Sequence, residues 1–139
     1  MPGLEDKKIF RVLDANLNRA KEGLRVCEDV ARFILDEGAY TKRYKAIRHR
    51  LSKVCALALK GPLIAARAIG SDVGTRTSTA ELKRKNAQDI FYANSQRVKE
   101  SIRVLEEFFK LLDARQALKC KKMRYQIYAL EQEIFERLG

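Results

Sequence analysis

The chain has 139 residues, of which 46% are hydrophobic and 34% charged, with seven glycines, two prolines and no tryptophan. This composition is typical of one helical globular domain over residues 1–139 and excludes a disordered chain. Basic residues exceed acidic ones by 29 to 18, for a net charge of +11. Such an excess attracts polyanions, which include nucleic acid, an acidic membrane or a phosphorylated small molecule, but a solvated basic surface would give the same excess. No block of five or six like charges occurs, which argues against a nucleic-acid-binding tail.

Neither a membrane anchor nor an oxidised protein is expected. The longest apolar stretch, residues 54–69, is interrupted by Lys60, Gly61, Pro62 and Arg67, so it is too charged to span a bilayer. The N-terminus lacks the apolar run of a signal peptide. Three cysteines, an odd number and far apart, predict free buried thiols in a reducing compartment, by default the cytoplasm: Cys27, Cys55 and Cys120.

The first half of the chain predicts two helices. Apolar residues recur at three-and-four spacing over residues 4–36, which indicates one long amphipathic helix that ends at Glu37-Gly38. A second helix starts near Tyr40, and Gly61-Pro62 breaks or kinks it before a short apolar turn that ends at residue 69. A loop over residues 70–77 follows.

The second half of the chain predicts another pair of helices. Ser78 and Glu81 have the spacing of a capping box, so the third helix is expected to run from there to about residue 112. Asp113 interrupts the pattern and is expected to cap the fourth helix, which runs to about residue 138.

An internal repeat relates the two halves. Residues 15–29 (ANLNRAKEGLRVCED) return as residues 93–107 (ANSQRVKESIRVLEE), with eight of fifteen positions identical. The partner helices also match, since KAIRHRL at 45–51 resembles KKMRYQI at 121–127. The halves, about 4–69 and 78–138, therefore predict an all-α, pseudo-twofold bundle of four main helices built from a duplicated helical hairpin.

The repeat keeps polar residues on the apolar side of its helices, which suggests a repeated site. On a helical wheel Asn16 and Arg19 fall within the apolar arc, and Asn94 and Arg97 recur in the same geometry. Polar groups that point inward are costly unless they have a hydrogen-bond or ion-pair partner or are hydrated. Either a carboxylate across the bundle, for which Glu131 is a candidate, holds each arginine, or the residues line a cleft and offer donors to an anion.

Two further arginine pairs are retained between the halves. Arg48 and Arg124 lie inward on the partner helices and could belong to either scheme. Arg25 and Arg103 are predicted to face solvent, and their retention is explained by salt bridges with Glu28 and Glu106 or with neighbouring helices.

The Asp72-Val73-Gly74-Thr75 loop is a second candidate site. Backbone N–H groups at Gly74 and Thr75 could cradle a phosphate, and Asp72 could hold a Mg²⁺ ion bound to it. A simple turn followed by an N-cap would give the same pattern. Arg67, just ahead of the loop, is a further phosphate-binding candidate.

Several segments together resemble one known family. They are residues 11–33 (RVLDANLNRAKEGLRVCEDVARF), 71–75 (SDVGT), 92–111 (YANSQRVKESIRVLEEFFKL) and 124–131 (RYQIYALE). They look like the alternative hydroxymethylpyrimidine-phosphate kinase domain that is usually fused N-terminal to bacterial thiamine-phosphate synthase. No synthase domain follows Gly139, so the chain is expected to be free-standing or a cut-out.

The resemblance implies ATP-dependent phosphorylation of hydroxymethylpyrimidine phosphate to its diphosphate, with Mg²⁺ accompanying ATP. Phosphoryl transfer needs positioning, Mg²⁺ and cations around several negative charges. The residues then expected to act are Arg19 and Arg97 as phosphate clamps, Asn16 and Asn94 as orienting donors, and Asp72 as the Mg²⁺ ligand.

Other interpretations remain open. The chain could be a non-catalytic basic helical module that binds nucleic acid or a protein partner, although few aromatics and inward-pointing Asn and Arg argue against nucleic acid. A third possibility is that the domain has no activity of its own and only stabilises a thiamine-phosphate synthase partner. A homodimer could bury apolar surface left over by the long helices.

Overall fold

The computed structural model describes residues 4–66 and 82–139. Its elements are α1 (Leu4–Asp29), a short π-helix η1 (Val30–Ile34), α2 (Gly38–Ala66), α3 (Ala87–Phe109) and α4 (Ala114–Leu138). The described residues contain no strand, so the predicted all-α class is confirmed. In the described parts of the chain, no helix is both long and apolar enough to cross a bilayer.

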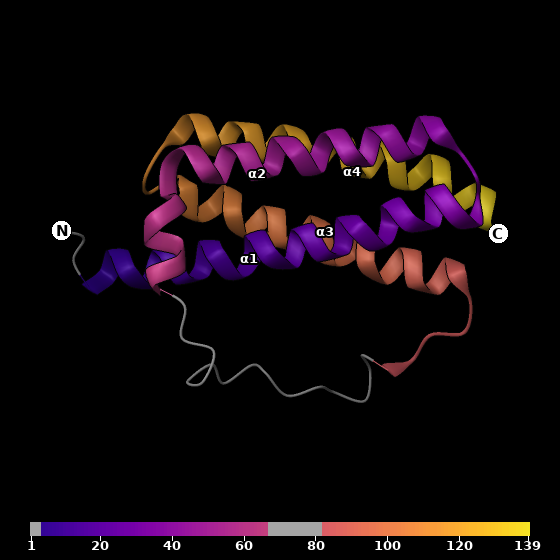
Figure 1. Ribbon diagram of the computed structural model, residues 1–139, viewed down its shortest axis with the longest axis horizontal. Helices are drawn as coiled ribbons and strands as arrows, with labels where there is room; N and C mark the ends of the chain where they lie inside the picture. The colour runs from indigo at the N-terminus through magenta and orange to yellow at the C-terminus, as the bar shows by residue number, and fades with distance from the viewer. Residues whose placement is uncertain (1–3, 67–81) are drawn as a thin grey trace.

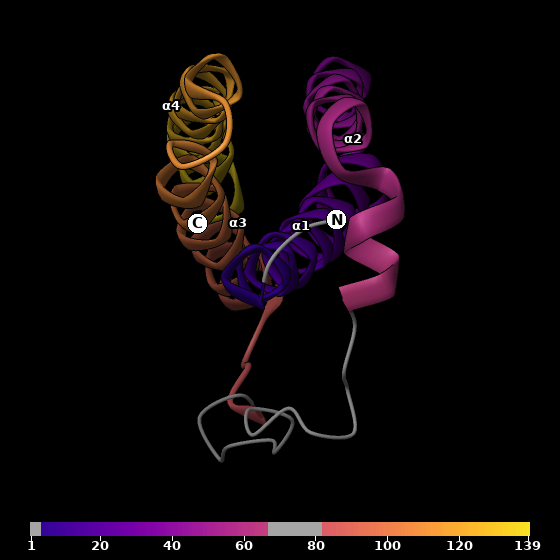
Figure 2. The ribbon, with the colours of Figure 1, turned by 90° about the vertical axis from the view of Figure 1, so that its left-hand side faces the viewer.

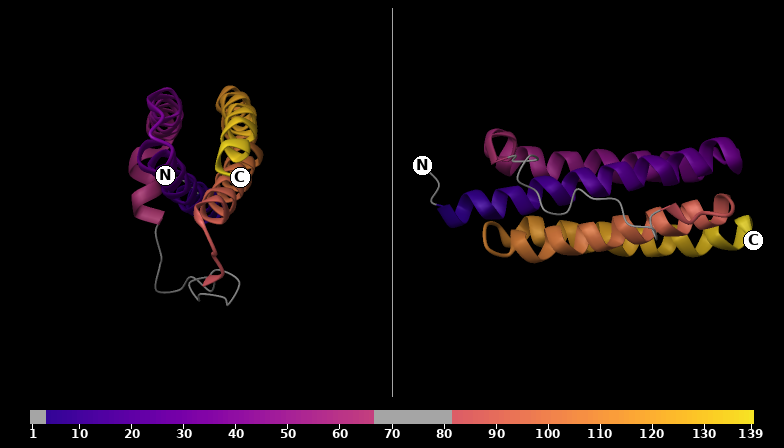
Figure 3. Two further views of the ribbon diagram at one scale, coloured as in Figure 1. Left: turned by 90° about the vertical axis from the view of Figure 1, so that its right-hand side faces the viewer. Right: turned by 90° about the horizontal axis from the view of Figure 1, so that it is seen from below.

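Two helical hairpins pack through their first helices. α1 and α3 lie side by side, α2 packs on α1, and α4 packs on α3 (Figures 1 and 3). Seen along the bundle, α1 and α3 form the base of a V, and α2 and α4 form its arms (Figure 2). This is the four-helix bundle of two similar halves that the repeat predicts. Its core consists largely of aliphatic and aromatic side chains, among them Leu13, Leu24, Leu51, Phe91, Ile102, Phe109, Ile127 and Ile134.

Gly23 sets how closely α1 and α3 approach. A Cβ atom at this position would lie 2.6 Å from Cγ2 of Val98 and 3.0 Å from the carbonyl oxygen of Asn94. Any larger residue would therefore push the two central helices apart. The repeat places Ser101 at the corresponding position of α3.

The first hairpin turns differently from the prediction. α1 ends at Asp29, and the π-helix follows it in place of further α-helix. The chain then reverses at Asp36, whose φ of 54° is left-handed, and Gly38 begins α2 instead of stopping the helix before it. Aspartate tolerates this conformation better than most residues, so a glycine was not required.

The predicted kink in α2 is present. The helix is continuous to Ala66, but the segment that carries Gly61 and Pro62 turns sharply away from the rest (Figures 1 and 2). Proline lacks an N–H group and clashes with the carbonyl four residues earlier, which bends the helix axis.

α3 begins later than predicted. Asn86 is its N-cap and accepts a hydrogen bond from the N–H of Asp89 at 2.9 Å, so the start near residue 78 is wrong. Ser78 and Glu81 themselves lie outside the described residues. α3 also ends at Phe109 instead of residue 112. The predicted cap of α4 is confirmed, since Asp113 accepts from the N–H of Arg115 at 3.0 Å.

Candidate functional site

A pocket of about 490 Å³ lies between α1 and α3. It brings together three of the residues singled out in the sequence: Asn16 and Arg19 from α1, and Arg97 from α3. A volume of this size is typical of sites for small molecules. The two halves of the repeat therefore contribute to one pocket, as two half-sites facing one cleft would. The remaining lining residues are Ala93, Gln96, Glu100, Ser101 and Val104.

In this pocket the asparagine is buried and the two arginines are exposed. Asn16 is only 5% exposed, and its amide nitrogen donates to the carbonyl of Val12 at 2.8 Å. Its Oδ1 atom lies 3.4 Å from Nη1 of Arg19, which orients the guanidinium. Arg19 and Arg97 are both exposed, which corrects the prediction that they point inward. Long arginine side chains start on the apolar arc but carry their charged heads to solvent.

Asn94 repeats the local structure of Asn16 without joining the pocket. Its amide nitrogen donates to the carbonyl of Ile90 at 2.8 Å, again four residues earlier. Asn94 does not line the pocket. Each asparagine thus donates to the backbone carbonyl four residues earlier. Only Asn16 also lines the pocket between α1 and α3.

Gln96 and Glu100 are functional candidates that sequence reasoning missed. Both line the pocket on the α3 side, where Glu100 adds an exposed carboxylate on the same helix as Arg97. The repeat held a signal for Glu100, because Glu22 occupies the matching position of the first half. Gln96 replaces Asn18 and could not have been distinguished from an ordinary helix-surface residue.

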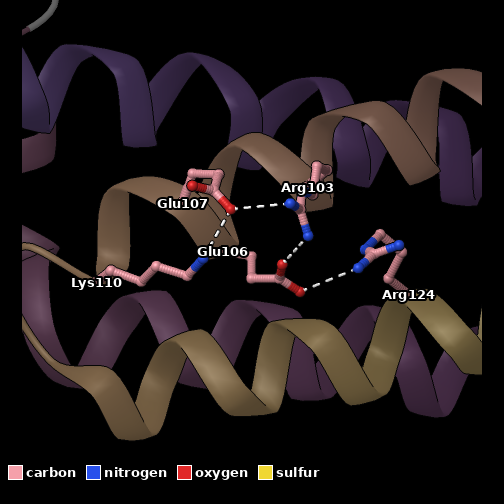
Figure 4. Close-up of polar contacts among 5 residues, drawn as sticks. All are labelled: Arg103, Glu106, Glu107, Lys110 and Arg124. Carbon is pink, nitrogen blue, oxygen red and sulfur yellow. Dashed lines mark hydrogen bonds and ion pairs between the residues drawn. The ribbon is translucent and has the colours of Figure 1, made fainter.

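Arg124 lies away from this pocket and holds a buried carboxylate. Glu106 on α3 is 3% exposed, and its Oε1 atom lies 3.3 Å from Nη2 of Arg124 on α4 (Figure 4). Arg103 contacts the other oxygen of Glu106 and also lies 3.1 Å from Glu107 (Figure 4). Arg124 therefore forms an interhelical ion pair and does not line the pocket between α1 and α3.

The first half contains the same cluster. Glu28 on α1 is 6% exposed and lies 3.3 Å from Nε of Arg48 on α2. Arg25 approaches the same carboxylate at 3.6 Å. The predicted salt bridges of Arg25 and Arg103 with Glu28 and Glu106 are thus confirmed. Arg48, like Arg124, joins its hairpin together and does not reach the pocket between α1 and α3.

Glu131 does not hold either pocket arginine, so that alternative is wrong. Its Oε2 atom pairs with Nζ of Lys99 at 2.6 Å, and both side chains are largely buried. Nζ of Lys99 also lies 4.6 Å from the ring centre of Tyr128. The pair lines a second pocket, of about 440 Å³, between α3 and α4.

The three cysteines are free and buried, as predicted. Burial raises the pKa of each thiol from 9.0 to about 12 for Cys27, Cys55 and Cys120, with nearby Glu131 adding to the effect at Cys27. Burial likewise raises the pKa of the Tyr44 hydroxyl above its usual range. None of these groups is prepared to act as a nucleophile near neutral pH.

The loop candidates Arg67, Asp72, Gly74 and Thr75 lie outside the described residues. Within the described ranges, no group of three His, Cys, Asp or Glu side chains could hold a metal ion.

A model of the ThiD2 family matches residues 11–133, which is most of the chain. The chain belongs to the ThiD2 family. This agrees with the family resemblance of the sequence segments described above, and the match includes the helices that form the pocket of this ThiD2 domain.

Curated relatives of the ThiD2 chain are named thiamine-phosphate synthase. The relative from Nostoc punctiforme is 41% identical over 127 residues, which cover 91% of this chain and 35% of the relative. The relative from Synechocystis sp. is 44% identical over 124 residues, or 88% of this chain and 35% of that protein. The ThiD2 chain thus spans about a third of the length of these relatives. No solved structure matches it.

Proposed function

We propose that this domain acts in thiamine biosynthesis as an ATP-dependent kinase that converts hydroxymethylpyrimidine phosphate to hydroxymethylpyrimidine diphosphate. Membership of the ThiD2 family and the thiamine-phosphate synthase relatives support the pathway. The observation that carries the reaction is the pocket between α1 and α3, where Arg19 and Arg97, equivalent in the repeat, converge on a space of about 490 Å³.

The reaction does not require a nucleophilic side chain from the protein. An oxygen of the pyrimidine monophosphate, already ionised at neutral pH, attacks the γ-phosphorus of ATP. The bond from that phosphorus to the β,γ-bridging oxygen breaks, and ADP leaves with the electron pair. No general base is required, and the work of the protein is positioning and charge stabilisation.

Each pocket residue has a role in this scheme. Arg19 and Arg97 clamp the phosphates from opposite halves of the repeat, since guanidinium groups bind phosphate oxygens in a bidentate fashion. Asn16 orients Arg19 through its 3.4 Å contact. Gln96 supplies a neutral amide donor on the α3 side.

ATP would be used with Mg²⁺, which would offset the negative charge of the phosphates. Mg²⁺ is commonly held by substrate phosphates, waters and one or two carboxylates, so a large protein cage is not required. Glu100 is the carboxylate that lines the described pocket. Asp72 remains the proposed ligand from the loop, with Gly74 and Thr75 as backbone phosphate contacts and Arg67 as a further cation.

Direct detection of the product tests this proposal. The chain is incubated with ATP, Mg²⁺ and the pyrimidine monophosphate, and ³¹P NMR follows formation of the diphosphate and ADP. We expect stoichiometric formation of both, dependent on Mg²⁺. Absence of the diphosphate, with the chain folded by circular dichroism, would favour a non-catalytic module that binds or steadies a thiamine-phosphate synthase partner.

A further inference from the structure

The cleft between α2 and α4 carries a second cluster of cations. A pocket of about 290 Å³ lies there, with Val54 and Met123 as its buried apolar floor. Its walls carry only basic polar groups, from both helices: Arg50, Lys53, Lys119 and Lys122. Like charges that face each other across a cleft repel, so this arrangement is unfavourable without an anion between them.

At the other end of the same cleft, a carboxylate neutralises the positive charge. There Arg43 on α2 pairs with Glu133 on α4 at 2.6 Å. The repeat aligns Arg43 with Lys119, but it aligns Glu133 with Leu57, so the carboxylate that would neutralise the cationic end is missing from the sequence. The charge excess of this pocket is therefore a departure from the symmetry of the two hairpins.

Three cations that face another helix elsewhere in the described structure have carboxylate partners. Arg48, Arg124 and Lys99 each form an interhelical ion pair. Among the described residues no ion pair involves Lys53, Lys119 or Lys122, and Nε of Arg50 donates only to the carbonyl of Ala46, at 3.4 Å. The four lining cations thus keep their charge available for a ligand.

We propose that the α2–α4 cleft binds a small anion with two or three linked phosphates. Such a chain carries three or four negative charges, which match the four lining cations. The four cations are exposed, and the buried apolar floor between them offers no carboxylate that would compete with the anion. A duplex nucleic acid fits poorly, because the four exposed cations flank a pocket of only about 290 Å³.

This site is separate from the pocket of the proposed kinase reaction. The kinase pocket is lined by α1 and α3, at the base of the V, and the cationic cleft by α2 and α4, its arms (Figure 2). The two share no residue. The proposal therefore goes beyond the kinase function, and an experiment can support or contradict either one without the other.

Calorimetric titration with tripolyphosphate tests the site, using the whole chain. The variant Lys53→Gln with Lys122→Gln removes one charge from each wall and keeps most of each side chain. Its matched control, Lys42→Gln with Lys45→Gln, removes two exposed charges from α2 outside the cleft. We expect the cleft variant to weaken tripolyphosphate binding about tenfold or more and the control less than about twofold.

Further titrations show which kind of anion the cleft prefers and whether the kinase pocket contributes to the binding. Orthophosphate should bind far more weakly than tripolyphosphate, and ATP should compete with tripolyphosphate if nucleotides are the source of the linked phosphates. Arg97→Ala should leave intact the part of tripolyphosphate binding that the Lys53→Gln, Lys122→Gln pair weakens. Equal weakening by both lysine pairs, or preference for a DNA duplex over tripolyphosphate, would overturn the proposal.

Discussion

The most informative residues of the repeat are two buried glutamates. Glu28 and Glu106 sit at equivalent positions, and each is joined to an arginine of the next helix, Arg48 or Arg124. A buried carboxylate is costly unless a cation neutralises it. The retention of these charges in both halves therefore reflects how each hairpin is joined, whereas Arg19 and Arg97 are retained without a carboxylate partner among the described residues.

Loss of Arg124 should destabilise the fold. In Arg124→Ala the carboxylate of Glu106 stays buried with only the half-exposed Arg103 as a partner, so we expect unfolding to become easier by about 2 kcal/mol. Urea denaturation followed by circular dichroism measures this change. Arg115→Ala, at an exposed site on the same helix, is the control and should change stability by less than about 0.5 kcal/mol. Equal stability of the two variants would contradict the structural role of the pair.

The cysteines predict a pH dependence. Their pKa values rise from 9.0 in model thiols to about 12 in the fold, so the folded state holds these protons more tightly than the unfolded state. Their stabilising contribution is complete below pH 9 and is lost as the pH rises towards 12.

Thiol labelling at pH 8 checks this. Because a rise of three pKa units lowers the thiolate population about a thousandfold, iodoacetamide should modify the native chain far more slowly than the urea-unfolded chain. Rapid modification of any of the three cysteines in the native chain would contradict their burial.

At the scale of the elements, the contact between α1 and α3 depends on one glycine. In Gly23→Ala the new methyl group would lie 2.6 Å from Val98 and 3.0 Å from a backbone oxygen, so the two central helices must separate. We expect a net loss of about 1–2 kcal/mol, because overpacking outweighs the gain in helix propensity. Gly38→Ala is the control, since nothing lies within 4 Å of its Cβ position, and its stability should be unchanged or higher. Thermal unfolding that ranks the two variants the other way would contradict the close approach.

Periodicity predicted the four helices, the kink at Gly61-Pro62 and the cap at Asp113, because these features depend on local sequence. The left-handed turn at Asp36 was missed, since it depends on a residue other than glycine adopting a positive φ. Lys99 was also missed: its place in the repeat does not distinguish it from an exposed helix lysine, yet it is buried against Glu131. A helix that packs against two neighbours buries a wider arc than a single apolar stripe predicts.

At the scale of the whole molecule, duplication gave a common framework and the two halves then diverged. The repeat aligns Glu131, which pairs with Lys99 in the second half, with Cys55 in the first. Sequence predicted the convergence of the halves because it retains Arg19 and Arg97. It could not show that Asn94 stays outside the shared pocket, since that depends on how the two hairpins are offset when they pack.

The central claim is that the pocket between the halves transfers a phosphoryl group, and turnover by Arg97→Ala tests it most directly. Arg11→Ala, exposed on α1 outside the pocket, is the matched control. With ATP, Mg²⁺ and the pyrimidine monophosphate, we predict that Arg97→Ala lowers kcat/KM at least about a hundredfold while circular dichroism stays unchanged, and that Arg11→Ala retains activity. Full activity in a folded Arg97→Ala variant would contradict the assignment.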